Sequence, residues 1–296
     1  MRMNEIQLSQ LLDQARAFVN EGKHLHAEQV YHRLIREETM FLQPYKELAS
    51  LYAESGNVAA GVNVLSRANE LFPSNGELAF QLGTLYLQAQ QYDKAITCYQ
   101  KLAGKPATTG PHVHFNMGIA FFYKNNIKRA EEHLRMTLKL DAKFPKANET
   151  LGEILIHRKA YAEATQYLKR GIDIDPYSNI SHHLLGTAYQ ALDSVKNAYN
   201  EFVLAIEMDP KESHSWQKCG EVLLKMKRFE EAEQYLRKAL ELDPHSADTL
   251  ANFGQLYLMK GDATLSNEFF SRALKVDPNH DGARFGKLQS KHSNKT

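Results

Sequence analysis

Cysteine is scarce in this sequence. Cys98 and Cys219 are the only two, and they lie far apart in the chain. Two widely separated thiols do not make a disulfide framework, so the simplest interpretation is a chain kept in a reducing compartment. The N-terminal residues 1–8 also lack the continuous apolar run of a secretory signal. We therefore expect a cytoplasmic protein.

A strong charge and a long apolar run are both missing. Lys and Arg total 36 against 35 Asp and Glu, which gives a formal net charge of +1. Such a balanced chain has no global field to attract RNA, DNA or an acidic membrane. No apolar stretch reaches the roughly 18 residues that a membrane-spanning helix requires. The sequence therefore predicts no nucleic acid among its partners and no membrane span.

Motifs that carry chemistry are also absent. Neither Gly-x4-Gly-Lys-Ser/Thr nor Gly-x-Gly-x2-Gly occurs, so a phosphate cradle is not expected. The pairs His112/His114 and His182/His183 look like metal ligands, but residues one or two apart on a helix point to different faces. We predict that the protein is not an enzyme and that it holds neither a metal nor a cofactor.

What the sequence does contain is a repeat of 34 residues, which is most complete in residues 179–212. There Gly186, Ala198 and Pro210 stand at positions 8, 20 and 32, and related residues occupy these slots in most other copies. A period of this size is typical of a solenoid, in which each repeat contacts only its neighbours. We predict eight repeats, the third one residue longer than the rest, with the bounds 8–41, 42–75, 76–110, 111–144, 145–178, 179–212, 213–246 and 247–280.

Each repeat predicts two helices. Apolar residues within 184–189 follow the i, i+1, i+4, i+5 spacing of a helical face, and a second such face begins at Ala198. Small residues at positions 8 and 20 let the two helices approach closely, while larger side chains at position 24 fill the space beside the contact. The expected fold is an all-α solenoid of antiparallel helix pairs.

Proline and serine mark the expected helix ends. Proline removes an amide donor and disfavours helix at the residue before it, so Asp-Pro pairs should end the second helices. These pairs stand at residues 175–176, 209–210, 243–244 and 277–278. Ser178, Ser213 and Ser246 follow them closely and are expected to be N-caps of the next helices.

The repeat resembles the tetratricopeptide repeat. The seventh block carries the resemblance through Trp216, Cys219, Gly220, Leu223, Ala232, Leu236, Ala239 and Pro244. The similarity covers residues 8–280, although the first block has Ala15 for the glycine and Thr39 for the proline. The resemblance implies a right-handed superhelix whose concave surface binds other proteins. It is specific for the fold and says little about the partner.

Both ends of the solenoid need covering. Residues 1–7 are expected to be an N-terminal extension that joins the first helix. Residues 281–288 predict a short capping helix that lays Phe285 and Leu288 over the last repeat, although two glycines weaken it. Such a cap is either frayed but adequate, cut from a longer chain, or a site of self-association through the C-terminal end. The polar tail 289–296 is expected to be disordered.

The candidate binding site comes from a comparison of the eight copies. In the resembled family, ligands contact first-helix positions 2, 5, 6, 9, 12 and 13, and in this chain position 12 is apolar in seven copies, as a packing slot would be. Phe115, Ile119 and Tyr123 occupy positions 5, 9 and 13 and form one stripe, and Phe80 should stand next to it. An exposed apolar patch favours binding. The alternative is that these aromatics fill a gap left by the insertion at 104–111.

Polar residues beside the stripe complete the candidate site. His112 and Asn116, at positions 2 and 6, are predicted to bond a bound backbone. The family's carboxylate clamp, which holds the C-terminal tail of a chaperone, finds only Asn116 and Lys146 among its five required residues in the nearest window. We therefore predict that this chaperone tail is not the ligand, and we keep Lys146 as a member of the candidate site.

The sequence as a whole predicts a non-catalytic protein-interaction scaffold that binds an extended peptide or a partner helix in its concave groove. The alternative is a substrate-presenting or regulatory arm that acts with a separate enzyme such as a glycosyltransferase. Asn116 and Asn252, both at position 6, resemble the asparagine ladder of such arms, but the other copies lack it.

Overall fold

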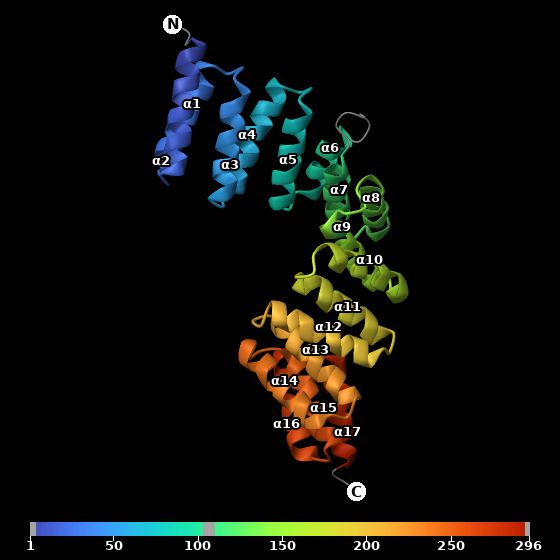
Figure 1. The fold of residues 1–296 in the computed structure, drawn as a ribbon. Helices are drawn as coiled ribbons and strands as arrows, with labels where there is room; N and C mark the ends of the chain where they lie inside the picture. The colour runs from blue at the N-terminus through green and yellow to red at the C-terminus, as the bar shows by residue number, and fades with distance from the viewer. Residues whose placement is uncertain (1–3, 103–109, 294–296) are drawn as a thin grey trace. The chain divides into compact units, whose positions relative to one another are not determined.

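The structure is a computed structural model that describes residues 4–102 and 110–293 (Figure 1). Every regular element in these ranges is an α-helix, and seventeen helices follow one another along the chain. The predicted all-α solenoid of helix pairs is confirmed. The chain divides into two compact units, Met1–Phe144 and Pro145–Thr296. Each unit has hydrophobic core clusters of its own.

The first unit contains four helix pairs. Their bounds are α1 Glu5–Asn20, α2 His24–Glu37, α3 Leu42–Glu54, α4 Val58–Leu71, α5 Gly76–Gln88, α6 Tyr92–Gln100, α7 Pro111–Tyr123 and α8 Ile127–Leu140. The two helices of each pair pack together, and the second helix of one pair contacts the first helix of the next. The core between them is built from fully buried side chains such as Tyr31, Leu48 and Leu65.

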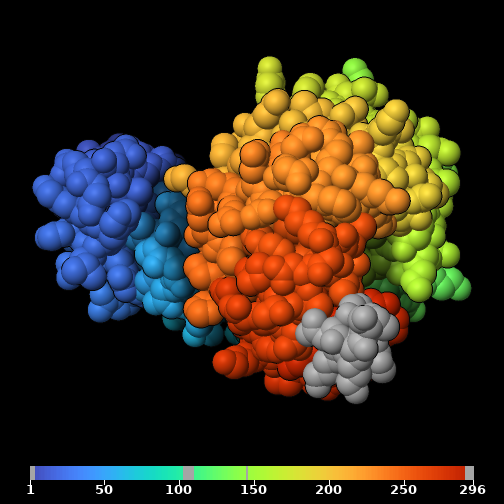
Figure 2. All heavy atoms as spheres, turned by 90° about the horizontal axis from the view of Figure 1, so that it is seen from below, coloured from blue at the N-terminus to red at the C-terminus, as the bar shows by residue number. Residues whose placement is uncertain are grey.

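The second unit contains four more pairs and a final helix. Their bounds are α9 Pro145–His157, α10 Tyr161–Ile174, α11 Asn179–Ala191, α12 Val195–Met208, α13 Ser213–Lys225, α14 Phe229–Leu242, α15 Ala247–Met259, α16 Ala263–Val276 and α17 Asp281–Ser293. The side chains of its last repeats form a closely packed surface, orange to red in Figure 2. Among the described residues of either unit, no helix has the length and apolar character to cross a membrane.

The helix pairs follow the predicted blocks, although α1 already begins at Glu5, within the expected extension 1–7. The repeat bounds themselves stay a prediction. Most of the predicted loop at 104–111 lies outside the described residues. Its last two residues are described: Gly110 is the N-cap of α7 and Pro111 its first residue.

The turn inside every repeat uses one left-handed residue at position 15. In three repeats this residue is glycine, and in five it is a residue with a side chain. The eight residues are Gly22, Gly56, Gln90, Asn125, Lys159, Asp193, Lys227 and Gly261, with φ between 56° and 84°. Because most side chains disfavour this conformation and Asn and Asp tolerate it, the local backbone strain lies at Gln90, Lys159 and Lys227.

Small residues at position 8 permit the close contact within each pair, as predicted. A Cβ atom on Gly186 would lie 2.7 Å from Cε1 of Phe202, and one on Gly220 would lie 2.6 Å from Leu236. The same atom on Gly220 would be 3.5 Å from the carbonyl oxygen of Ala232. The side chain at position 24 therefore lies directly against the first helix and fills the space between the two helices.

The predicted helix ends are confirmed with one correction. The Asp of each Asp-Pro pair is the C-cap of its helix, as the donor-free proline requires. Ser178 and Ser246 are N-caps whose side chains accept a backbone amide. Ser213 is not a cap, because Glu212 precedes it and accepts the amides of His214 and Ser215. A carboxylate suits this position because it faces the positive end of the helix dipole.

The C-terminal helix packs with a different face from the one predicted. Ala283, Gly286 and Ser290 face the last repeat and are buried, whereas Phe285 is 64% and Leu288 59% exposed. Gly286 lies so close to the Phe270 ring that a Cβ atom would be 2.2 Å from it. The small residues thus make the contact. The helix also runs to Ser293, beyond the predicted cap, so the expectation of a disordered tail is wrong for 289–293, while 294–296 lie outside the described residues.

Candidate functional site

The predicted stripe lies on α7, but its two ends turn to different neighbours. Phe115 is half-buried, and its ring centre is 4.9 Å from that of Phe144, which follows α8. His112 is exposed and meets the same Phe144 ring edge-on at 5.0 Å. Ile119, in the middle of the stripe, is half-buried. The N-terminal end of the stripe is therefore an aromatic cluster of His112, Phe115 and Phe144.

Tyr123 lies at the other end of α7 and is 63% exposed. Its ring stacks on Tyr92, the first residue of α6, with the ring centres 5.4 Å apart and 11° between the planes. Next to this stack, Lys124 forms an ion pair with Asp93. The Tyr123 ring is thus held in place by the stack on Tyr92 and still exposes much of its surface.

Asn116 is already engaged within the chain. Its Nδ2 donates to the hydroxyl oxygen of Tyr99 over 3.1 Å. The Tyr99 hydroxyl lies 3.2 Å from Thr84 Oγ1, and because Thr84 donates its own proton to the Phe80 carbonyl, Tyr99 donates to Thr84. Burial of Tyr99 raises the pKa of its phenol to about 12. The amide group predicted to bond a ligand is instead part of a network between repeats.

Phe80 is half-buried, and its ring packs on Tyr99 at 5.8 Å. The structure thus places Tyr99 between Phe80 and α7, so Phe80 belongs with the stripe through this intermediate ring. On its other side Phe80 lines a cavity of about 220 Å³ between α3 and α5. The remaining lining residues are Lys46, Ala49, Ser50, Ala53, Leu65, Gln81, Thr84, Leu85 and Gln88.

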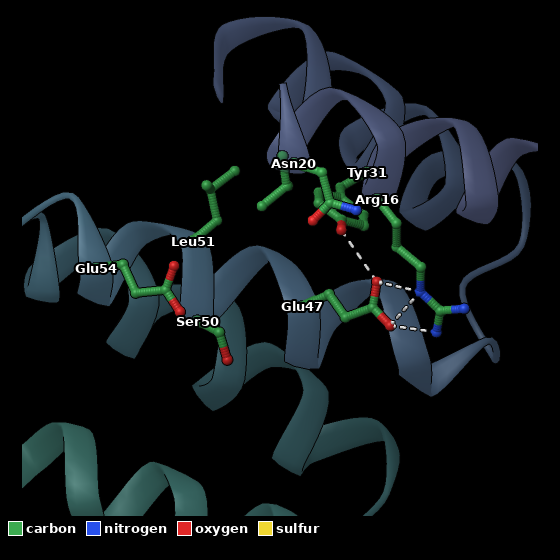
Figure 3. Close-up of a pocket in the computed structure, with 8 residues that line it drawn as sticks. Arg16, Asn20, Tyr31, Glu47, Ser50, Leu51 and Glu54 are labelled. Atoms are coloured by element: carbon green, nitrogen blue, oxygen red, sulfur yellow. Dashed lines mark hydrogen bonds and ion pairs between the residues drawn. The ribbon is translucent and has the colours of Figure 1, made fainter. Parts of the chain in front are cut away.

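A second cavity of about 220 Å³ lies one repeat earlier, between α1 and α3 (Figure 3). Its centre is Glu47, which accepts hydrogen bonds from Arg16 at 2.6 Å and from the Tyr31 hydroxyl at 3.0 Å. Burial acts to raise the pKa of Glu47, but hydrogen bonds from Arg16, Gln43 and Tyr31 hold the pKa below its usual value. Ser50 lines this cavity as well as the next one. We call the surface formed by α1, α3, α5 and α7 the first-helix face.

Lys146 belongs to the second unit, where it is exposed on α9. The second unit also has a cavity that sequence reasoning missed. Its volume is about 360 Å³, and it lies among α14, α15 and α16. Its lining residues are Arg237, Leu240, Glu241, Phe253, Tyr257, Phe269 and Arg272. Phe253, Tyr257 and Phe269 stack on one another there.

Sequence reasoning also missed the importance of position 24 for the first-helix face. The slot was assigned to packing, yet Tyr31 and Tyr99 use it to place a hydroxyl on that face. The available signal was the pairing of a tyrosine at position 24 with a polar residue at position 6 of the next repeat. Glu47 and Asn116 are those partners, and the same comparison singles out Leu65 and Gln81 between them.

Two curated proteins share part of the sequence. The chain is 28% identical over 120 residues to the general transcriptional corepressor trfA of Dictyostelium discoideum, a match of 40% of this chain and 9% of that protein. It is 29% identical over 115 residues to the small glutamine-rich tetratricopeptide repeat-containing protein 2 of Mycosarcoma maydis, a match of 38% of this chain and 32% of that protein. The matched regions span less than a third of each relative.

Solved structures and family models agree on the fold. The structure of pilF from Pseudomonas aeruginosa superimposes with a TM-score of 0.63 at 18% identity, over 72% of this chain and 97% of that one. Models of the tetratricopeptide repeat match residues 44–114, 115–179, 181–212 and 223–291. Together these segments cover most of the chain and at least part of every predicted repeat from the second onward. The chain therefore belongs to the tetratricopeptide repeat family.

Proposed function

We propose that this chain is a non-catalytic scaffold that holds an extended peptide or a partner helix against the first-helix face of its first unit. The observation that supports this most strongly is the pair of neighbouring cavities that share Ser50 as a common wall. A ligand lying across α1, α3 and α5 meets the two cavities in turn. Apolar anchors in such cavities supply affinity, and polar neighbours fix orientation.

The aromatic residues of α5 and α7 extend this surface. Phe80 forms part of the second cavity, and Tyr123 offers an exposed ring held by its stack on Tyr92. Phe115 and Ile119 lie between them in sequence and are half-buried, so each still presents part of its surface. His112 is exposed and is proposed as a polar contact of this surface, whereas Asn116 acts through Tyr99. Lys146, which is exposed on α9 of the second unit, is proposed separately as a polar contact there.

Replacement of anchors on the first-helix face tests the proposal. The double variant Phe115→Ser/Tyr123→Ser should keep its helical circular dichroism and lose capture of peptides from a random displayed library. Tyr177→Ser is the matched control, because Tyr177 is 77% exposed in the second unit. The control should capture the same peptides as the unchanged chain. Unchanged capture by the double variant would contradict the assignment of α7 to the binding face.

The alternative, an arm that serves a separate enzyme, makes a different prediction. Affinity purification followed by mass spectrometry should then recover an enzyme with the chain, and the recovery should survive the Phe115→Ser/Tyr123→Ser change if the arm uses another face. Recovery of partners that depends on Phe115 and Tyr123, and that includes no enzyme, favours the scaffold.

A further inference from the structure

One contact between repeats occurs twice in the first unit. The Tyr31 hydroxyl, at position 24 of the first repeat, bonds Glu47 at position 6 of the next repeat over 3.0 Å. The Tyr99 hydroxyl, at position 24 of the third repeat, bonds Asn116 at position 6 of the fourth over 3.1 Å. In both cases a phenol fills the space between successive first helices and satisfies a polar side chain there.

The second repeat lacks this phenol. Leu65 stands at its position 24 and has no hydrogen-bonding group to offer the next repeat. Gln81, at position 6 of the third repeat, keeps a buried Oε1 that finds no hydrogen-bond partner in residues 4–102 and 110–293. A buried amide oxygen without a partner costs about 1–3 kcal/mol relative to a satisfied one.

The second unit contains the same combination. Leu236 stands at position 24 of the seventh repeat, and Asn252 at position 6 of the eighth has a buried Nδ2 without a partner in the described part of the chain. Asn116, which follows a tyrosine at position 24, is paired, whereas Gln81 and Asn252, which each follow a leucine, keep one buried unpaired atom. A phenol is therefore one group that satisfies an amide at position 6.

The space for a phenol is present beside Leu65. The cavity of about 220 Å³ between α3 and α5 is lined by Leu65 itself, by Gln81 and by Ala49 at position 8. In the first repeat the equivalent cavity has Tyr31 in its wall, and Ala15 at position 8 is fully buried. Both cavities measure about 220 Å³, so what distinguishes them is the wall, which has a phenol beside Glu47 in the first and none beside Gln81 in the second. The volume is below the roughly 300 Å³ at which pockets for drug-sized ligands begin, so it suits one side chain.

A hydroxyl at position 9 of the cavity matches the one beside Tyr99. Ser50 donates its proton to the Lys46 carbonyl at 3.1 Å, as Thr84 does to the Phe80 carbonyl. Ser50 Oγ is thus an acceptor at the place where Thr84 Oγ1 accepts from Tyr99. An incoming hydroxyl therefore meets two acceptors, Gln81 Oε1 and Ser50 Oγ, and an apolar floor at Leu65.

We propose that the cavity at Leu65 is a subsite for a tyrosine side chain of a bound peptide, whose phenol replaces the ring that the first and third repeats supply from within. The inference rests on the proposed scaffold function and gives that scaffold a sequence preference. A phenol donates to Gln81 Oε1, while phenylalanine or leucine leaves this acceptor unpaired. Sites built around a buried hydrogen-bonding group discriminate strongly against analogues that lack the partner group.

Small probes test the cavity without a peptide. Binding of p-cresol, the tyrosine side chain, is compared with binding of toluene by titration of the chain's NMR spectrum. We expect p-cresol to bind more tightly than toluene and to shift the Gln81 side-chain amide. Gln81→Leu should weaken p-cresol about threefold to tenfold and leave toluene unchanged, because it removes one hydrogen bond. Equal binding of the two probes, or no effect of Gln81→Leu, would overturn the proposal.

Filling the cavity from within provides a matched pair of variants. Leu65→Tyr should abolish p-cresol binding and raise the melting temperature above that of Leu65→Phe, since only the tyrosine satisfies Gln81. The first repeat already holds Tyr31 beside Ala15, so tyrosine is expected to fit beside Ala49. If Leu65→Tyr melts no higher than Leu65→Phe, the predicted hydroxyl contact does not form and the inference fails.

A displayed library of random peptides separates this inference from the scaffold function. Peptides selected on the unchanged chain should be enriched in tyrosine, and Leu65→Tyr should lose them. If peptides bind but show no tyrosine enrichment and still bind Leu65→Tyr, the scaffold stands and the subsite fails. If no peptide is selected while p-cresol binds as expected, the subsite stands and the peptide-binding function fails.

Discussion

The hydroxyl of Tyr99 lies 3.1 Å from Nδ2 of Asn116 and links the second helix of the third repeat to the first helix of the fourth. Tyr99→Phe keeps the ring but leaves the Asn116 amide and the Thr84 hydroxyl without this partner. We expect a loss of about 1–2 kcal/mol in the free energy of unfolding. Urea-induced unfolding followed by circular dichroism measures it.

Tyr123→Phe is the control for this change. Tyr123 is 63% exposed, and its interaction is a ring stack that phenylalanine can keep. The free energy of unfolding should change by less than about 0.5 kcal/mol. Equal losses in Tyr99→Phe and Tyr123→Phe would show that the hydroxyl of Tyr99 does not stabilise the junction.

A pair of histidines, His114 buried and His133 half-buried, predicts that acid destabilises the first unit. His114 Nδ1 and His133 Nδ1 are 3.1 Å apart, so one must be neutral to accept the bond. Burial lowers the pKa of both imidazoles, and the neighbouring His114 and Arg129 lower that of His133 further against the opposite effect of Glu132. Both imidazoles therefore bind a proton less readily in the folded protein than in the unfolded chain. The stability they confer is present above about pH 6.5 and is lost as pH falls through their folded pKa values.

The measurement is a series of urea titrations from pH 7.5 to pH 5. Each proton taken up on unfolding contributes a slope of up to about 1.4 kcal/mol per pH unit. His133→Phe should flatten this slope, because one of the two groups is gone and Phe121 can still stack on the new ring. A variant with the same slope as the unchanged chain would contradict the assignment.

The left-handed turn residue at position 15 predicts a stabilising change. Lys227 has φ of 58°, a conformation that costs a side-chain-bearing residue more than glycine. Lys227→Gly should raise the free energy of unfolding by about 0.5–1 kcal/mol, the local strain exceeding the entropy lost by glycine. Lys238→Gly, in the exposed interior of α14, should instead lower it by about 1 kcal/mol. The same sign in both variants would argue against strain at the turn.

The contact of α17 with the last repeat depends on Gly286. A Cβ atom there would lie 2.2 Å from the Phe270 ring, whereas one on Gly282 would meet only the His280 ring at 3.3 Å. Gly286→Ala should cost about 1–3 kcal/mol by overpacking and speed hydrogen exchange of the α17 amides. Gly282→Ala should leave that exchange unchanged or slower, because alanine favours helix. Fast exchange in both variants would show that the effect does not depend on the close contact between Gly286 and Phe270.

Much of the fold follows from the sequence because its signals are local and recur eight times. The Asp-Pro pairs end helices wherever proline removes an amide donor, and this holds at Asp175 as at Asp277. The prediction of Ser213 as an N-cap is wrong because Glu212, which also offers a side-chain acceptor, stands one residue earlier and takes that role. The predicted buried face of α17 is wrong because hydrophobicity favours burial of Phe285 and Leu288. The Phe270 ring lies so close to α17 that only a residue without a side chain, Gly286, fits against it.

The sequence predicted which repeat positions carry the candidate site, but not which residues their side chains contact. The recurrence of positions identified Phe80, Phe115, Ile119 and Tyr123 as departures from the common repeat, but recurrence does not say where a ring turns. Phe115 turns to Phe144 and Tyr123 to Tyr92 because those rings lie within reach across the helix packing. Which rings meet is a property of the packed repeats, not of their spacing in the chain.

The sequence by itself determined the repeat, its helix pairs and the family, since each depends on residues within one 34-residue block and its neighbour. Only the tertiary structure decided that position 24 reaches the first-helix face, that Asn116 is satisfied by Tyr99, and that Gln81 is not satisfied by Leu65. The physical reason is that a hydrogen bond between repeats requires two side chains to meet at about 3 Å, and this distance is fixed by packing.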